Sequence, residues 1–371
     1  MIPIAKPHID EKDIEGVKKV LESGMLSLGP KLSEFEEKFA EFIGTKYAIA
    51  VSSGTSGLHL CMKALNLKED DEIITSPFSF ISSSNCILYE KAKPVFVDIN
   101  EQTKNIDPEQ IEKAITPKTK AILPVHIFGE PCDMESIIKI AEKYKIPVIE
   151  DACEAIGTIY NGKKVGSFGL ASVFAFYANK QMTTGEGGIV CTNNEMVYNL
   201  CKSLRNQGRA EDMQWLDHNK LGFNYRLNDL SCSLGITQLQ KIDFLIKEKE
   251  VLAKKYNEIL LDIPNIKLPK ETEHKSWFVY TINLDQKYNR DKIIKEMQKR
   301  GIATKPYLPS IHLQKFYRDT FNYKEGDFPV SEKISNTSLA LPFFIGLKDD
   351  EINYIKQNLK EVLQSDEFLR R

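Results

Sequence analysis

The sequence predicts a two-domain α/β protein whose larger domain contains a mainly parallel sheet. Short apolar segments alternate with amphipathic segments from about Lys46 to Cys191. This alternation of strands and helices is typical of a parallel sheet that is covered by helices on both faces. The chain has 371 residues, which is enough for such a domain and a second, smaller one.

Seven short apolar segments account for the sheet. The expected strands are Tyr47–Val51, Glu72–Ser76, Pro94–Asp98, Ala121–His126, Pro147–Asp151, Ser172–Phe176 and Gly188–Cys191. Four amphipathic segments between them are expected to be helices, namely Ser56–Leu65, Ser83–Glu90, Pro108–Ile115 and Met134–Tyr144. We therefore expect a seven-stranded sheet between helices.

The C-terminal part predicts a different organisation. A long helical stretch from about Leu227 to Tyr256 would lead out of the first domain. After it, Trp277–Asn283 predicts a strand, and Arg290–Arg300 and Asp349–Gln364 predict helices. We expect residues 14–240 to form the large domain, and residues 241–371 with 1–13 to form a smaller α+β domain.

Composition and charge exclude several classes of partner. Lys and Arg number 50 and Asp and Glu number 52, so a net charge of −2 gives no electrostatic case for nucleic acid or an anionic membrane. No apolar run approaches the roughly 18 residues of a membrane span, and the N-terminus lacks the apolar core of a signal peptide. The seven cysteines and six histidines show no metal-ligand or redox spacing. We expect a cytoplasmic protein with reduced thiols and no metal site.

Lys180 stands where an apolar run ends and a glycine-rich turn begins. The run Phe174–Tyr177 precedes it, and the turn Thr183–Gly188 follows it. Most lysines are solvated surface cations, because lysine is almost never fully buried unless paired. The aromatic residues before Lys180 predict a buried position instead. A lysine removed from water can act as a nucleophilic amine, which is what a Schiff-base lysine requires.

Two more strand ends carry polar groups, and ligands bind at the carboxyl ends of strands in open parallel sheets. The segment Ser52–Gly57 joins a strand to a helix and predicts an anion site for a phosphate, or else a plain helix N-cap. The segment Glu150–Glu154 places carboxylates after an apolar strand, where one of them could hold a ring nitrogen protonated. The alternatives for these acids are a helix start and a metal site, although no histidine lies nearby in the sequence.

Together these groups predict a site for pyridoxal phosphate. A phosphate-binding turn, a carboxylate beside the ring nitrogen and a buried lysine are the groups that this cofactor requires. Asp151 and Lys180 follow consecutive expected strands, so one cofactor could contact both. Phe80 follows another strand and could stack on a flat ring, or could be an ordinary core aromatic residue.

These motifs resemble those of the DegT/DnrJ/EryC1/StrS sugar aminotransferase family, whose members have the fold-type I pyridoxal-phosphate transferase fold. The resemblance covers nearly the whole chain, and its blocks recur in the family's order. The matching blocks are Ser23–Pro30, Ser53–Thr55, Pro77–Phe80, Val97–Ile99, His126–Gly129, Glu150–Ala152, Lys180 with Thr183–Gly188, Leu204–Arg209, Gly222–Arg226 and Ile311–Gln314.

The resemblance implies a role for each matching residue. Lys180 is similar to the family's Schiff-base lysine, Asp151 to the partner of the pyridinium nitrogen, and Phe80 to the aromatic residue that stacks on the ring. Gly54, Thr55 and Ser56 match the phosphate-binding turn. Asn224 matches an asparagine that reaches the phosphate of the neighbouring subunit, which implies a homodimer with shared active sites.

Two positions depart from the family's pattern. Ala175 stands where many members have a serine that binds the phosphate. Glu154 stands where many members have glutamine or histidine beside the oxygen of the cofactor ring. A carboxylate there would repel a phenolate unless the two shared a proton. The lysine at position 180 argues against the dehydratase branch of the family, in which histidine replaces it.

The resemblance also implies a reaction. It is transamination of a nucleotide-linked keto-6-deoxyhexose, at C4 or C3, with L-glutamate as amino donor, in the synthesis of deoxyamino sugars for lipopolysaccharide, another surface glycan or an antibiotic. Tyr307, Lys305 and His312 would suit a substrate-facing loop, or could be ordinary surface or packing residues. One alternative is an aminotransferase for a non-nucleotide cyclic ketone such as an inosose. Another is a non-catalytic regulator that binds the cofactor.

Overall fold

The computed structural model describes residues 1–210, 217–272 and 274–370. Within these ranges, seven strands form one sheet in the order β1-β9-β8-β5-β4-β2-β3, since two parallel bridges join the segments of β4 and β5. The strands are β1 (Tyr47–Val51), β2 (Glu72–Thr75), β3 (Lys93–Phe96), β4 (Thr119–Ile122), β5 (Ile149–Asp151), β8 (Ala171–Ala175) and β9 (Gly188–Thr192). The predicted seven-stranded, mainly parallel sheet is confirmed. Only β9 runs antiparallel to its neighbours in this sheet.

The strand that we expected over Ala121–His126 is shorter than predicted. Regular pairing of β4 ends at Ile122, and Pro124, which follows closely, has no N–H group to donate to a neighbouring strand. The chain still runs beside β5, where His126 N donates to Asp151 O at 3.0 Å. It then turns through the 3-10 helix Ile127–Gly129.

The helices around the sheet follow the prediction closely. They are α3 (Gly54–Ala64), α4 (Ser82–Leu88), α5 (Pro108–Ala114) and α6 (Met134–Tyr144). Three further helices were not predicted, namely α1 (Glu11–Ser23), α2 (Pro30–Ile43) and α7 (Glu195–Arg205). A short hairpin of β6 (Ile159–Tyr160) and β7 (Lys163–Lys164) lies between β5 and β8 in the chain.

The long helix expected over Leu227–Tyr256 is two helices. They are α8 (Asp229–Gln240) and α9 (Ile242–Leu260), and Lys241 between them has the non-helical angles φ −115° and ψ 17°. The ammonium group of Lys241 binds Asp10 and Asp13 at 2.7 and 2.5 Å. This contact with the N-terminal segment lies at the break, and sequence periodicity gave no signal of it.

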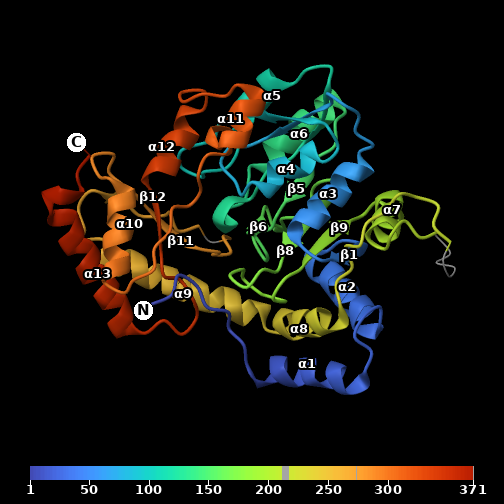
Figure 1. Cartoon of the computed structure of the whole chain (residues 1–371), viewed down its shortest axis with the longest axis horizontal. Helices are drawn as coiled ribbons and strands as arrows, with labels where there is room; N and C mark the ends of the chain where they lie inside the picture. Colours follow the sequence, from blue (N-terminus) through green and yellow to red (C-terminus); the bar gives the residue numbers. More distant parts are fainter. Residues whose placement is uncertain (211–216, 273, 371) are drawn as a thin grey trace.

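The C-terminal part contains a second, smaller sheet with its own core. Its antiparallel strands are β10 (Ile266–Lys267), β11 (Tyr280–Leu284) and β12 (Ser338–Leu341). Figure 1 shows β11, β12 and the helices α10 (Arg290–Lys299) and α13 (Asp349–Gln364) at one end of the molecule, with α9 leading there from α8. The remaining helices are α11 (Lys315–Phe321), α12 (Pro329–Thr337) and the 3-10 helices Ile311–Leu313 and Asp366–Phe368. The N-terminus joins this part, because Ile2 pairs with Ile302.

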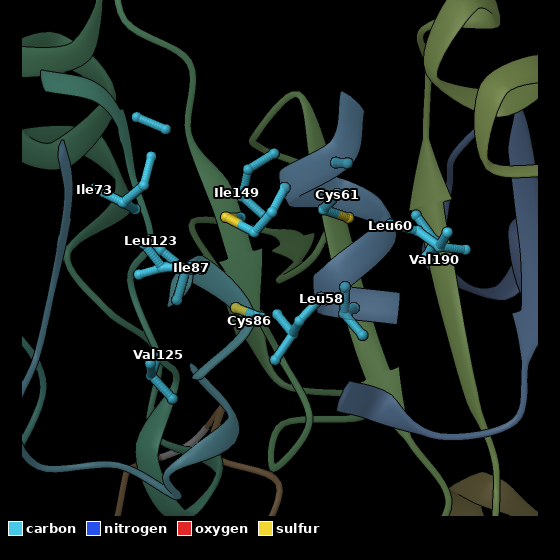
Figure 2. Close-up of a cluster of buried hydrophobic side chains, with 14 of the residues drawn as sticks. Leu58, Leu60, Cys61, Ile73, Cys86, Ile87, Leu123, Val125, Ile149 and Val190 are labelled. Carbon is cyan, nitrogen blue, oxygen red and sulfur yellow. The ribbon is translucent and has the colours of Figure 1, made fainter. Parts of the chain in front are cut away.

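The core between α3 and the sheet fixes the helix that begins at the expected phosphate turn. Leu58, Leu60 and Cys61 of α3 are almost completely buried, in the same cluster of apolar side chains as Ile149 and Val190 of the sheet (Figure 2). Complete burial of one such aliphatic side chain contributes about 1.5–3 kcal/mol. The N-terminus of α3 is therefore held firmly at the edge of the sheet. No helix among the described residues is both long and apolar enough to cross a bilayer.

Candidate active site

A cavity of about 550 Å³ opens at the carboxyl ends of the parallel strands. Each of β1, β2, β4, β5 and β8 is followed by residues that line it. They include Ser53, Gly54 and Thr55 after β1, Ser79 and Phe80 after β2, Val125 after β4, Asp151, Cys153 and Glu154 at and after β5, and Ala175 and Lys180 at and after β8. Phe278, Tyr307 and Leu308 of the C-terminal part complete the wall. The sheet topology thus brings together residues that are more than a hundred positions apart.

The turn between β1 and α3 presents polar groups to the cavity. Ser53 caps α3 by accepting a hydrogen bond from Ser56 N at 3.1 Å. The hydroxyl of Thr55 donates to the hydroxyl of Ser82 at 2.9 Å, and both residues line the cavity. A helix N-terminus with adjacent hydroxyls favours an anion such as a phosphate. The plain N-cap and the anion site, which the sequence left as alternatives, are therefore compatible here.

Gly54 lies directly against Ala175. A β-carbon on Gly54 would come within 2.8 Å of Ala175 Cβ and 2.9 Å of Cys153 Sγ. The residue that replaces the family's serine thus borders the phosphate turn, as the resemblance implied. Its methyl group offers no hydrogen bond, so contacts to a phosphate would come from other groups of this wall, such as the hydroxyls of Thr55 and Ser82.

Asp151 is held from two directions. One carboxylate oxygen accepts a hydrogen bond from the Ser83 hydroxyl at 2.7 Å, and the other accepts from Cys153 N at 3.1 Å. The Ser83 hydroxyl is also 2.7 Å from that of Ser79. Because each carboxylate oxygen can accept two hydrogen bonds, Asp151 retains acceptor capacity for a group in the cavity. The carboxylate is therefore oriented but not saturated.

Lys180 and Glu154 meet inside the cavity. The Lys180 Nζ lies 3.8 Å from Glu154 Oε1 and 4.1 Å from the ring centre of Phe278. The other oxygen of Glu154 accepts a hydrogen bond from Phe128 N at 2.9 Å. Burial raises the pKa of Glu154, although the charge of Lys180 opposes that shift. Lys180 is partly rather than fully buried, with 13% of its side chain exposed, and it lies beside the acidic end of β5 as expected.

Glu150 has a structural position instead. It is fully buried, and its two oxygens accept hydrogen bonds from the backbone N–H groups of Gly166, Phe168 and Gly169. Its carboxylate also lies 3.2 Å from His126 Nε2. Neighbouring acids in the sequence therefore have different surroundings, with Glu150 inside the fold and Asp151 and Glu154 at the cavity.

Phe80 and Tyr307 provide aromatic surface at the cavity wall. Phe80 is 62% exposed, which is high for a large apolar side chain and leaves its ring free to stack on a ligand. The hydroxyl of Tyr307 lies 3.5 Å from Asn179 Nδ2, and burial raises the pKa of Tyr307 to about 12. Tyr307 therefore remains protonated at neutral pH and can donate a hydrogen bond.

Four residues predicted for the site do not line this cavity, namely Ser56, Asn224, Lys305 and His312. The hydroxyl of Ser56 is turned to Ser52 and Ser53, at 3.0 and 2.8 Å. Asn224 is exposed and pairs with Asn206 through the backbone. Lys305 is exposed and pairs in the same way with Ala340.

His312 does not face a ligand. Its side chain is completely buried, its Nε2 lies 3.0 Å from Glu332 Oε1, and its ring packs against Phe328. Burial also lowers the pKa of His312. The structure therefore supports the packing alternative for His312, and the prediction of a substrate-facing residue is wrong here.

Sequence reasoning missed Ser83 and Phe278, which contact Asp151 and Lys180. Ser83 lies in the serine-rich run 79–84, and this group of hydroxyls after a strand was a signal that could have been used. Phe278 had no such signal, because only the packing of the C-terminal part brings it to the cavity.

These residues fit pyridoxal phosphate. Gly54 and Thr55 with the α3 N-terminus offer an anion site, Asp151 has a free acceptor position, Lys180 offers an amine, and Phe80 offers a flat apolar surface. The fold and the site together define a pyridoxal-phosphate-dependent transferase of fold type I.

The chain belongs to the DegT/DnrJ/EryC1/StrS aminotransferase family, whose model matches residues 7–360. It is 35% identical to the GDP-perosamine synthase of Vibrio cholerae over 366 residues, which is 97% of this chain and 98% of that protein. The structure of the Helicobacter pylori aminotransferase PseC, involved in the biosynthesis of pseudoaminic acid, superimposes with a TM-score of 0.93 at 32% identity and covers 98% of this chain and 99% of that one.

The PLP-form of the putative sugar aminotransferase Spr1654 from Streptococcus pneumoniae gives the same TM-score of 0.93 at 26% identity, with 98% of this chain and 99% of that chain covered. The protein is thus a pyridoxal-phosphate-dependent sugar aminotransferase, and the predictions of fold, cofactor and enzyme class are confirmed.

Proposed function

We propose that this enzyme transfers the amino group of L-glutamate to the C4 or C3 ketone of a nucleotide-linked 6-deoxyhexose. The carrying observation is the placement of Lys180 and Asp151 in one cavity of about 550 Å³, which continues to Phe278 and Tyr307. This volume is within the range of about 300–1,000 Å³ that is usual for ligand sites and leaves room beyond a cofactor. The named activities of the relatives favour an amino sugar as product.

In this proposal, each residue at the cavity has a separate role in binding the cofactor or in moving a proton. When bound, pyridoxal phosphate supplies the carbonyl that takes up the amino group and the ring that disperses negative charge. Gly54 and Thr55 hold its phosphate, Asp151 keeps the ring nitrogen protonated, and Phe80 stacks on the ring. The Nζ of Lys180 takes up and returns the proton that moves in each half of the reaction. Glutamate leaves as 2-oxoglutarate, and the ketone becomes an amine.

We also propose a cytoplasmic homodimer with shared sites. Asn224 lies outside its own chain's cavity and is exposed, which suits a residue that acts in the partner's site. Met25, Leu26, Leu28 and Leu221 are 44–89% exposed, and exposed apolar side chains of this size are often covered by another protein. We also propose that the chain has two domains, with residues 14–240 in the large domain and residues 241–371 with 1–13 in the small one. The pairing of Ile2 with Ile302 supports it.

A panel of nucleotide-linked 3-keto and 4-keto 6-deoxyhexoses with ¹⁵N-glutamate tests the reaction. We expect one sugar to gain the ¹⁵N label while an equal amount of 2-oxoglutarate forms, as measured by mass spectrometry. Lys180→Ala is the control and should give no labelled sugar. Labelling of an inosose in preference to every nucleotide sugar would favour the non-nucleotide alternative. The alternative of a non-catalytic regulator does not fit a member of this aminotransferase family that has both Lys180 and Asp151 in the cavity.

A further inference from the structure

Gln181 directly follows Lys180 but does not line the large cavity. It is only 3% exposed and borders a second, small cavity of about 10 Å³. Its Nε2 donates hydrogen bonds to the backbone carbonyl oxygen of Glu154 at 2.6 Å and to that of Ser276 at 3.1 Å. Buried carbonyl oxygens need a hydrogen-bond donor, and Gln181 supplies one to both. One side chain therefore joins the segments after β8 and β5 to the C-terminal part.

The two carbonyl groups lie where the backbone is closely packed. Gly129 has a φ of +82°, and a β-carbon there would come within 1.7 Å of Ser276 O and 3.3 Å of Glu154 O. The Thr158 hydroxyl accepts a hydrogen bond from Ser276 N at 3.2 Å and donates one to Gly129 O at 2.7 Å. The backbone of Ser276 is thus held by two side chains, with Gln181 at its carbonyl group and Thr158 at its N–H group.

Each segment that Gln181 binds carries a group that meets Lys180. Glu154 provides its carboxylate, whose Oε1 lies 3.8 Å from Lys180 Nζ. Phe278, two residues after Ser276, provides its ring, whose centre lies 4.1 Å from the same nitrogen. Lys180 itself immediately precedes Gln181. All three groups are therefore within two residues of a hydrogen bond made by one amide.

Packing alone does not explain an amide at position 181. The Oε1 of Gln181 is buried and accepts no hydrogen bond from the described residues. A buried acceptor without a donor is costly, so a methionine of similar size would pack here more favourably. We propose that Gln181 is a positioning residue, which holds the Glu154 carboxylate and the Phe278 ring in place around the reacting amine. This rests on the role of Lys180 in the proposed function.

The first test follows the position of the C-terminal segment in cofactor-free protein without substrate. Trp277 lies between Ser276 and Phe278 and is one of two tryptophans in the chain. The ¹⁹F NMR signal of 5-fluorotryptophan at position 277 therefore reports on this segment, and Trp215→Phe identifies which signal it is. Gln181→Met should shift the signal, because it keeps the size of the side chain and removes both donors. An unchanged signal in folded Gln181→Met protein would overturn the proposal.

Gln238→Met is the matched control. Gln238 is 1% exposed, and its Nε2 also donates two hydrogen bonds, to His8 O and Asp13 Oδ2, each at 2.9 Å. Its Oε1 accepts from Thr183 N at 3.3 Å, so it also contacts the turn that follows the active-site lysine. Its loss should leave the Trp277 signal unchanged. A shift as large as in the first variant would show a general effect of removing a buried glutamine and would also overturn the proposal.

The second test measures the half-reaction of cofactor-loaded enzyme with glutamate, from the change in visible absorbance. Gln181→Met should lower the maximal rate by about tenfold to 100-fold, the cost of misplacing a reacting group by about 1 Å. Cofactor affinity should stay near that of wild type, because Gly54, Thr55 and Asp151 are untouched. The glutamate concentration for half-maximal rate should also stay near that of wild type. A raised concentration with an unchanged maximal rate would overturn the proposal, since it indicates a role in substrate binding instead.

Thr158→Val is a second variant, which leaves Gln181 in place. It has a similar shape and removes only the hydrogen bonds of the hydroxyl, including the one from Ser276 N. It should shift the Trp277 signal and lower the maximal rate less than Gln181→Met does, because Glu154 stays bound. A shifted signal with a wild-type rate would show that this segment does not affect the reaction and would overturn the proposal. The NMR measurements use neither cofactor nor substrate, so they can fail while the keto-sugar assay succeeds, and the reverse.

Discussion

At the scale of single residues, the site depends on how three neighbouring acids are partnered. Glu150 is saturated by three backbone N–H groups and His126, Asp151 is oriented by Ser83 with acceptor capacity left, and Glu154 faces Lys180. A carboxylate whose acceptor positions are all occupied by protein donors stabilises the fold, whereas one with a free acceptor position can accept a hydrogen bond from a ligand. The role of each acid in this segment therefore depends on its hydrogen-bond partners and not on its residue type.

Asp151→Asn should preserve the fold and cofactor binding but lower turnover by about 100-fold or more. An amide cannot keep the ring nitrogen protonated, so the ring loses its capacity to disperse negative charge. Cofactor absorbance and the rate of the glutamate half-reaction measure the two effects. Ser83→Ala is the graded comparison, since it removes one hydrogen bond to Asp151 and keeps the carboxylate. Near-normal turnover of a cofactor-loaded Asp151→Asn would contradict the assignment.

Glu154→Gln should change the pH dependence of stability in the cofactor-free protein. Burial raises the pKa of Glu154 in the folded state, so the folded protein binds this proton more tightly than the unfolded chain does. Stability from this group is complete below the ordinary glutamate pKa and is lost as pH rises through the folded-state value. The variant should therefore gain in Tm relative to wild type between pH 4.5 and pH 8. A constant difference in Tm across that range argues against the raised pKa.

Glu154→Gln should also retain the cofactor, because glutamine can still donate a hydrogen bond to the ring oxygen. The pH at which the visible absorbance of the bound cofactor changes should nevertheless shift, since the shared proton is gone. Absorbance titrations of wild type and variant measure this. Superimposable curves would mean that Glu154 points away from the ring in the loaded enzyme.

At the scale of elements, the cavity exists because several parallel strands end at one edge of the sheet. The N-terminus of α3 adds the proposed anion site there, and burial of Leu58, Leu60 and Cys61 fixes its position. Gly54 allows the first turn of α3 to approach Ala175 and Cys153 closely. The phosphate turn is thus positioned by packing beneath it as much as by its own sequence.

Gly54→Ala should push the first turn of α3 away from β8. The added β-carbon would lie 2.8 Å from Ala175 Cβ, and overpacking of this kind costs about 1–3 kcal/mol. We expect a lower Tm and weaker cofactor binding, measured by thermal unfolding and by equilibrium dialysis. Adding Ala175→Gly should restore part of both losses, because Cys153 Sγ at 2.9 Å remains. An unaffected cofactor affinity would separate this turn from the phosphate site.

At the scale of the whole molecule, one chain does not bring all the predicted cofactor contacts together. Asn224 is exposed and lies outside the cavity that contains Lys180. A symmetric dimer places the same surface of each subunit against the other, so each chain could lend Asn224 to its partner. The proposed shared site therefore predicts a defined behaviour of mixed dimers.

Lys180→Ala and Asn224→Ala proteins, each with little or no activity alone, should regain activity when they are mixed and allowed to exchange subunits. Every mixed dimer would contain one site with both wild-type residues, so a fully exchanged equal mixture should recover about a quarter of the wild-type rate. Native mass spectrometry verifies the exchange. Absence of activity despite demonstrated exchange would mean that each chain has a self-contained site.

The sequence alone determined the alternation of strands and helices, the seven strands and the three strand-end motifs with Ser53–Thr55, Asp151 and Lys180. These are local signals, because hydrophobic periodicity and turn residues act over a few positions. Family resemblance supplied the roles of these residues. The break at Lys241 was not predicted, because its side chain binds Asp10 and Asp13, more than two hundred positions away.

Only the tertiary structure decided which side chains share the site. His312 and Tyr307 are five positions apart, yet one is buried against Glu332 and the other lines the cavity. Phe278 reaches Lys180 only because the C-terminal part packs against the large sheet. The physical reason is that burial, ion pairing and desolvation depend on contacts between distant segments, whereas secondary structure follows mainly from neighbours in the chain.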